Sequence, residues 1–364
     1  MIAALVLALG LAAHRPAPPH VSAARFQDSP VVLHIRAKKG ARLRCSVDRH
    51  APRPCTRRTK LKLSAGAYSI AVWAVAHGRA SRKRQVQVVV PTPAPAAVRV
   101  GGTPVAIAAA AQDLWVSTSG DAVEVDATTH RVTARITVGG SLGGVAASGP
   151  NVWVSVFDGG QVAHIANGAV VGWTNVGGQP TAVAFAAGSV WVGNQNGWVN
   201  RIDPATGHVL ATLHLLSGDS TLLLVGKLLW AGLQDGSLVS IDPATNAVTG
   251  STVHVAPDLD ALVDTPQGLW ASTFAGVAAS IDAVSRKVLH RVHLPSRGGG
   301  IAYGGGFVWF SMYDSGLVAE LSPFSGSVVG AVHTGLQPRD SLVVGQTLWV
   351  VDQGAGKLTP IPVG

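Results

Sequence analysis

The chain of 364 residues has no apolar run of the roughly 20 residues that a membrane-spanning helix requires. Its first 13 residues are apolar but too few to cross a bilayer, and a small-residue pattern follows at Val21-Ser22-Ala23. We interpret residues 1–23 as a secretory signal peptide, although no Lys or Arg precedes the apolar stretch. The sequence therefore predicts an exported protein, extracellular or in the cell envelope, whose mature chain has no transmembrane span.

Cysteine is almost absent, since Cys45 and Cys55 are the only two. No histidine stands at zinc-finger spacing from them, which disfavours a metal half-site. In an exported chain the pair predicts a disulfide that closes a hairpin-sized loop and stabilises the fold by roughly 2–3 kcal/mol.

Acidic residues are scarce in one part of the chain only. Residues 24–92 hold 16 Lys or Arg against Asp28 and Asp48, a net charge of +14, whereas residues 96–364 hold 11 basic and 17 acidic residues, a net charge of −6. Such a basic segment predicts an anionic partner. Few aromatic residues interleave with the basic ones, which disfavours the base stacking of a nucleic-acid surface.

For an exported protein, an anionic cell-envelope polymer or lipid headgroups fit this basic segment better than nucleic acid does. A solvated basic surface, or docking onto a protein partner such as the acidic part of the same chain, is the alternative. The candidate polyanion-binding residues are Lys38, Lys39, Arg42, Arg57, Arg58, Lys60, Lys62, Arg82, Lys83 and Arg84.

Short runs with the two-residue period of half-buried strands fill residues 24–90, as in Lys60-Leu61-Lys62-Leu63. They predict a small β-sandwich. Cys45-Ser46-Val47-Asp48, followed by Gly66-Ala67-Tyr68 and a long strand, resembles the immunoglobulin-like modules of bacterial cell-surface proteins. Residues 91–95, Pro-Thr-Pro-Ala-Pro, predict a semi-rigid linker to the rest of the chain.

Seven tryptophans recur at intervals of 38 to 40 residues, each within a short apolar run. They are Trp115, Trp153, Trp191, Trp230, Trp270, Trp309 and Trp349. A period near forty residues predicts a β-propeller with one four-stranded blade per repeat, and the tryptophans are expected to pack between blades. The predicted fold class is all-β: a small immunoglobulin-like β-sandwich followed by a seven-bladed β-propeller over residues 96–364.

The last repeat ends after its third strand, near residues 357–363. Its missing outer strand matches the start of the predicted propeller, because residues 98–102 (Val-Arg-Val-Gly-Gly) follow the same pattern as residues 136–140 (Ile-Thr-Val-Gly-Gly). We expect residues 97–100 to pair beside residues 357–362 and to close the ring.

The Trp-Val pairs, the Asp-Pro-Ala-Thr-Gly of residues 203–207 and the Val-Gly-Gly-Gln-Pro of residues 176–180 resemble bacterial YVTN/NHL-type propellers, which include streptogramin lyases. That resemblance implies, as an alternative function, a metal-dependent lyase or hydrolase with His and Glu groups on one face of the ring. The only glutamates, Glu124 and Glu320, are expected inside third strands, and the loops of that face contain no His. No catalytic residue or metal ligand is therefore carried over.

Two other patterns are better explained without a ligand. The Asp-Pro segment at residues 203–207 suits a type I turn, which disfavours a calcium loop or a quinone-cofactor repeat. His214, His254, His293 and His333 share one outer-strand position, where we expect them to be too far apart to bind one ion. Trp173 and Trp198 fall outside the tryptophan series and are freer to be exposed.

Because no acid–base, nucleophile or metal constellation converges, we predict a non-enzymatic binding or scaffold protein without a cofactor, while enzyme activity stays open. A ligand is expected on the face that carries the loops between blades and the turns after the Trp strands. The candidate ligand-binding residues there are Gln179, Asn194, Gln195, Asp219, Asp258, Asp260, Arg297, Tyr313, Asp314, Arg339 and Asp340.

Overall fold

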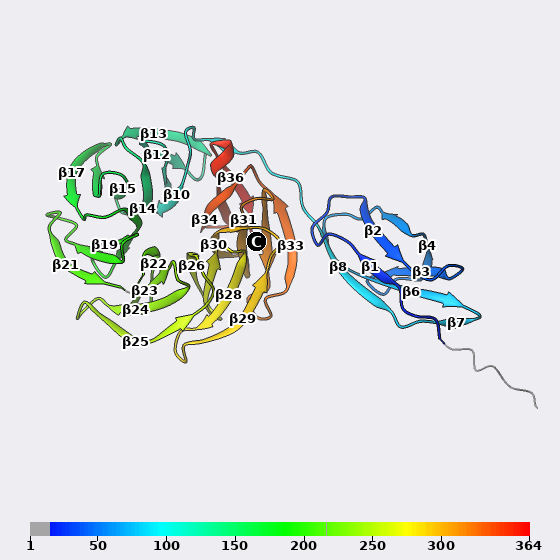
Figure 1. Cartoon of the computed structure of the whole chain (residues 1–364). Coiled ribbons are helices and arrows are strands. Elements are labelled where there is room, and N and C mark those ends of the chain that lie inside the picture. The colour runs from blue at the N-terminus through cyan, green and yellow to red at the C-terminus, as the bar shows by residue number, and fades with distance from the viewer. Residues whose placement is uncertain (1–14, 216) are drawn as a thin grey trace, which may run out of the picture. The chain divides into compact units, whose positions relative to one another are not determined.

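The computed structural model describes residues 15–364, apart from Leu216 and the side chains of Asp219 and Ser220. Most of the predicted signal peptide lies outside the described residues. The chain divides into two compact units, Met1–Pro91 and Thr92–Gly364. Regular structure in the described part consists of strands and one 3-10 turn, η1 (Gln353–Ala355), which confirms the all-β prediction (Figure 1).

The first unit contains two antiparallel sheets around one core. Leu33, Ile35, Cys45, Ile70 and Val72 are buried between them. One sheet has the strand order β1 (His20–Ser22), β2 (Val31–Arg36), β5 (Arg58–Leu61). The other has the order β4 (Arg53–Cys55), β3 (Arg42–Val47), β6 (Gly66–Ala76), β7 (Arg79–Ala80), with β8 (Arg84–Val90) also paired to β6.

The predicted signal cleavage site, Val21-Ser22-Ala23, overlaps the end of β1. Val21 pairs with Ile35 of β2 and packs against the core of the first unit. Removal of residues 1–23 would therefore take an edge strand away from the three-stranded sheet.

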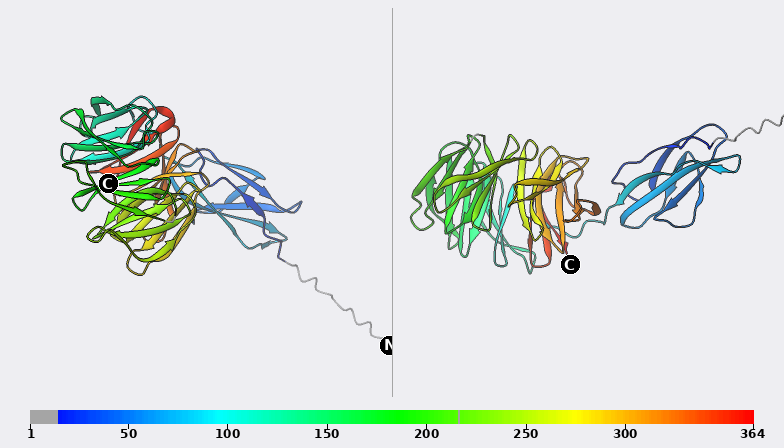
Figure 2. Two further views of the ribbon diagram at one scale, coloured as in Figure 1. Left: turned by 60° about the vertical axis from the view of Figure 1, so that its left-hand side comes forward. Right: turned by 90° about the horizontal axis from the view of Figure 1, so that it is seen from below.

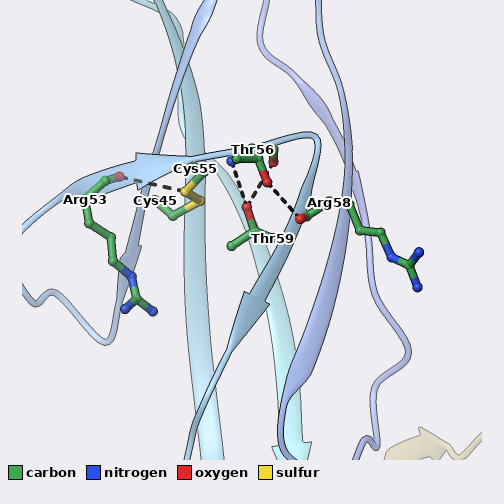
Figure 3. The surroundings of a disulfide bond; sticks show 6 residues. All are labelled: Cys45, Arg53, Cys55, Thr56, Arg58 and Thr59. Carbon is green, nitrogen blue, oxygen red and sulfur yellow. Dashed lines mark hydrogen bonds between the residues drawn. A yellow bond between two sulfur atoms is a disulfide. The ribbon is translucent and has the colours of Figure 1, made fainter.

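The predicted disulfide is confirmed. Cys45 of β3 is bonded to Cys55 of the neighbouring strand β4, with 5.9 Å between their Cα atoms (Figure 3). A tight turn follows, in which the Thr56 amide donates to Thr59 Oγ1 at 3.0 Å and Thr56 Oγ1 donates to the Arg58 carbonyl at 2.8 Å. The bond thus fixes the edge strand β4 just before the chain crosses to β5.

The second unit contains, in its described residues, seven four-stranded antiparallel sheets that follow one another along the chain. The first four comprise β10 (Ala106–Ala110), β11 (Asp113–Ser117), β12 (Asp121–Asp126), β13 (Arg131–Thr137); β14 (Leu142–Ser148), β15 (Asn151–Val156), β16 (Gln161–Ala166), β17 (Ala169–Asn175); β18 (Pro180–Ala186), β19 (Ser189–Asn194), β20 (Trp198–Ile202), β21 (Val209–His214); and β22 (Asp219–Val225), β23 (Leu228–Leu233), β24 (Ser237–Asp242), β25 (Ala247–His254).

The other three sheets comprise β26 (Leu259–Thr265), β27 (Gly268–Thr273), β28 (Val277–Asp282), β29 (Lys287–His293); β30 (Gly298–Gly304), β31 (Phe307–Met312), β32 (Leu317–Leu321), β33 (Val328–His333); and β34 (Pro338–Val344), β35 (Thr347–Asp352), β36 (Lys357–Pro362), β9 (Val98–Arg99). The first strand of each sheet contacts the first strand of the next, and β34 contacts β10. The sheets therefore form a closed ring of the β-propeller kind, visible in Figure 1 and from two further directions in Figure 2.

The last sheet draws strands from both ends of the second unit. Arg99 pairs with Lys357 and Val98 pairs with Leu358. The amides of Val100 and Gly101 both donate to the Gly356 carbonyl at 3.0 Å. The predicted pairing of residues 97–100 beside residues 357–362 is confirmed, and it joins the two ends of the ring by hydrogen bonds.

The seven recurring tryptophans lie in the core on the second strand of each sheet. Trp230 packs with Leu259, Leu269 and Ile281 of the following sheet, which shows how a large flat side chain fills the space between sheets. Their burial confirms the packing interpretation. Trp173 and Trp198, outside the series, are 49% and 40% exposed.

Candidate functional site

The ring encloses a central channel with a hollow of about 250 Å³, lined by residues from the first strands of all seven sheets. Small residues and backbone make up much of its wall, as at Ala106, Gly144 and Ala182. Charge is concentrated on one side, where Asp260, Arg339 and Asp340 line the hollow. Three of the predicted ligand-binding residues therefore share one site.

Register shifts in the first strands position these side chains. Thr181, Asp260 and Arg339 have no partner on the second strand of their sheet, although the residues on both sides of each do. An extra residue in one strand bends it and redirects its side chain. All three line the hollow, so the bulges are the local features that turn them toward the channel.

Asp260 and Arg339 form an ion pair across the channel. Arg339 Nη1 lies 2.7 Å from Asp260 Oδ1 and 2.5 Å from Asp260 Oδ2. The Asp260 carboxylate raises the pKa of the Arg339 guanidinium above its ordinary value, and burial opposes that shift. The side chains are 11% and 30% exposed, respectively, so the pair is shielded but still open to the channel.

Asp340 is the titratable group of the site. Its Oδ2 accepts from the Ile107 amide at 3.0 Å and its Oδ1 from the Ser341 amide at 2.8 Å, so it links the last sheet to the first. Burial raises the pKa of this carboxyl to about 6, although both amides favour the charged form. Beside it, Ser341 Oγ is buried without a hydrogen-bond partner among the described residues. The site thus offers a carboxyl that changes charge near pH 6.

A second group of predicted residues lies in the exposed loops. Arg297 Nη2 approaches Asp314 Oδ1 at 2.6 Å, and the guanidinium lies 4.9 Å from the ring centres of both Phe274 and Tyr313. The Asp314 carboxylate raises the pKa of Arg297, and Arg297 lowers the pKa of Asp314. Tyr313 Oη donates to Gln353 Oε1 at 2.9 Å.

Tyr313 also packs with Phe274, with 5.7 Å between their ring centres. Phe274 was missed by the sequence analysis. It holds the same repeat position as Tyr313, directly after the second strand, so alignment of the repeats could have found it.

Of the other candidates, Asp258 contacts the loop cluster through its backbone, because its carbonyl accepts from the Phe274 amide at 2.8 Å. Gln179, Gln195 and Asp258 are exposed on separate loops, where the Gln195 amide donates to the Gln179 carbonyl at 3.0 Å. Asn194 is fully buried, and its Nδ2 donates to the Trp198 carbonyl and to Asn200 Oδ1, both at 3.0 Å. The structure thus places Asn194 in the core rather than among the loop side chains. The side chain of Asp219 lies outside what the structure describes.

The four aligned histidines occupy equivalent ends of outer strands. His214, His254, His293 and His333 each pair with the first residue of the preceding strand. Across the described part of the chain, no group of three or more His, Cys, Asp or Glu side chains could hold one metal ion.

The basic side chains predicted to bind a polyanion are all exposed on the first unit. On the three-stranded sheet, His34 pairs with Arg58 and Val32 with Lys60, while Arg36 pairs with His20. Residues directly opposite in an antiparallel pair share one face. The outer face of this sheet therefore carries Arg36, Arg58 and Lys60 together.

The fold and the channel describe an all-β protein with a propeller-like ring. No protein-family model matches the chain, and no curated protein matches it. Among solved structures, the chain is similar to hydrazine synthase of Kuenenia stuttgartiensis, with 18% sequence identity, a TM-score of 0.65 and coverage of 72% of this chain and 96% of that one. At this identity the likeness shows the fold alone.

From residue 15 onward, leaving out Leu216, the structure contains no helix with the length and apolarity needed to cross a membrane.

Proposed function

We propose that residues 96–364 form a seven-bladed propeller of the YVTN/NHL type and that residues 24–90 form an immunoglobulin-like module. The seven consecutive four-stranded sheets and the pairing of β9 with β36 support the first assignment. Two observations support the second assignment: two sheets surround a common core, and a disulfide joins β3 to the edge strand β4.

We propose further that the chain is an exported, non-enzymatic binding or scaffold protein that attaches to an anionic cell-envelope polymer through its basic module. The observation that carries this proposal is the outer face of the paired strands β2 and β5, where Arg36 lies on β2 and Arg58 and Lys60 lie on β5. Asp28 and Asp48 are the only acidic residues of residues 24–92, so they cannot neutralise 16 basic ones. The remaining charge attracts a polyanion.

The exposed side chains of the module favour a hydrophilic polymer over a lipid bilayer as its partner. Of the large apolar side chains that are exposed in the described chain, none lies between residues 15 and 91. Trp73, the one tryptophan there, is buried with the ammonium of Lys83 4.9 Å from its ring centre. Nothing aromatic is thus presented for insertion into a membrane or for stacking on bases.

The propeller supplies the second binding surface. Its channel holds Asp260, Arg339 and Asp340, and the loops at the same ends of the strands carry Arg297, Tyr313 and Asp314. A pocket with a few convergent polar groups and a shifted pKa is the usual form of a ligand site. We assign the ligand or protein partner of the scaffold to this face.

The test is binding of the full chain to purified anionic cell-wall polymer. We expect the variant Arg58→Gln/Lys60→Gln/Lys62→Gln to bind at least tenfold more weakly than the unaltered protein. The matched control, Arg131→Gln/Lys227→Gln/Lys287→Gln, removes the same charge from exposed positions of the propeller and should bind within twofold. Equal loss in both variants would reject attachment through the basic module.

A further inference from the structure

A larger hollow of about 500 Å³ lies between the β30–β33 sheet and the last sheet. Its lining is mostly apolar and includes Pro93, Phe307, Trp309, Val332 and Ile361. Glu320 is the single charged side chain that lines it among the described residues. The volume is within the range of small-molecule pockets, roughly 300–1,000 Å³.

Glu320 has no partner of its own. In the described chain its carboxylate makes no hydrogen bond and no ion pair. Burial alone raises its pKa, since it is half-buried and no cation or donor offsets the desolvation. Gly330, on the neighbouring strand, leaves room for this carboxylate, because a Cβ there would collide with Glu320 Oε2.

Comparison among the repeats shows why the hollow exists. In three other sheets the turn between the third and fourth strands covers the tryptophan of the preceding sheet. The His130 ring lies 4.9 Å from Trp349, the Arg286 guanidinium 4.9 Å from Trp230, and Gly326 would place a Cβ 3.7 Å from the Trp270 ring.

The last sheet has no such turn, because its third strand, β36, and its fourth strand, β9, come from opposite ends of the unit. The place that a turn residue fills over Trp230 or Trp349 is therefore hollow beside Trp309. At one of the equivalent places the chain itself supplies a cation, the Arg286 guanidinium at 4.9 Å from the Trp230 ring. Tryptophan rings attract cations in this way.

We propose that this hollow binds a small organic ammonium ion, whose nitrogen pairs with Glu320 and whose apolar part packs against Phe307 and Trp309. The ammonium group would neutralise the unpaired carboxylate of Glu320. The apolar wall of the hollow would bury the apolar part of the molecule. A neutral ligand would cover the half-buried Glu320 carboxylate without giving it a partner. The proposal stands apart from the channel and from the basic module.

The test is isothermal titration calorimetry of the full chain at pH 7.5 with 2-phenylethylamine, and with 2-phenylethanol as its uncharged counterpart. We expect the amine to bind at least tenfold more tightly than the alcohol. Glu320→Gln should weaken amine binding at least tenfold, because it removes the charge and keeps the shape. The matched control is Glu124→Gln, which changes the residue paired with Trp115 as Glu320 is paired with Trp309.

Glu124 already accepts a hydrogen bond from Thr133 Oγ1 at 2.9 Å, so its replacement should leave amine binding within twofold. Equal binding of amine and alcohol, equal loss in both variants, or no binding of the amine at millimolar concentration would overturn the proposal. The comparison of the two probes uses the unaltered protein, so it decides the matter even where Glu320→Gln does not fold.

Discussion

Replacing Asp260 by Asn removes the carboxylate that pairs with Arg339 in the channel and leaves a shielded guanidinium without its main partner. Exposed ion pairs contribute about 0.2–1 kcal/mol, whereas breaking a fully buried pair costs about 3–5 kcal/mol. The pair has short contacts of 2.7 and 2.5 Å, and its side chains are 11% and 30% exposed. We therefore expect Asp260→Asn to lower the free energy of unfolding by about 2 kcal/mol.

Urea unfolding followed by tryptophan fluorescence measures this loss, because nine of the ten tryptophans lie in the second unit. Asp314→Asn is the matched control. It breaks the exposed pair between Asp314 and Arg297, whose side chains are 46% and 50% exposed, and should destabilise the protein less than Asp260→Asn does. The double variant Asp260→Asn/Arg339→Met should recover part of the loss, since no unpaired charge remains. The reasoning is refuted if Asp260→Asn costs no more than Asp314→Asn.

Three further predictions follow from the titratable groups and the disulfide. The pKa of Asp340 is raised from 3.8 to about 6, so the folded state favours the protonated carboxyl; the free energy of unfolding should fall by up to about 3 kcal/mol as pH rises from about 4 to 6, and urea titrations should show this fall absent in Asp340→Asn. The amide of Ala205 lowers the pKa of Asp203, so its carboxylate stabilises the turn above its ordinary pKa and loses that effect in more acidic solution; NMR titration should find the midpoint below 3.8. Cys45→Ala/Cys55→Ala should lower the free energy of unfolding of the first unit by roughly 2–3 kcal/mol without reductant, and reductant should abolish this difference from the unaltered protein.

Most of the fold of the second unit could be predicted from the repeat in the sequence. Trp115 to Trp349 mark the second strand of each sheet, and the Val-Gly-Gly pattern located β9 as the missing outer strand. These positions are predictable because each repeat solves the same packing problem with the same residue types. The start of the first unit was less predictable. The pairing of Val21 with β2 depends on tertiary contacts, and the short segment His20–Ser22 has no residue pattern that indicates a strand.

The sequence predicted which face of the ring carries the candidate site, but not which side chains reach the channel. Sequence position placed Asp260, Arg339 and Asp340 on the loops before the first strands, whereas their convergence depends on bulges that no residue pattern marks. Asn194 occupies the same loop face in sequence, yet its amide hydrogen bonds hold it in the core. The hollow beside Glu320 arises from a turn that the last sheet does not have, so only the assembled ring reveals it.

Cosedimentation of the full chain and of the second unit, residues 92–364, with anionic cell-wall polymer across a salt series tests the central claim most directly. We predict that the full chain sediments with the polymer at low salt and is released as salt rises, because attraction between exposed charges is screened over about 8 Å at physiological ionic strength. The second unit, which carries a net charge of −6 over residues 96–364, should stay in solution throughout. Binding by the second unit alone, or binding of the full chain that does not change with salt, would contradict the account.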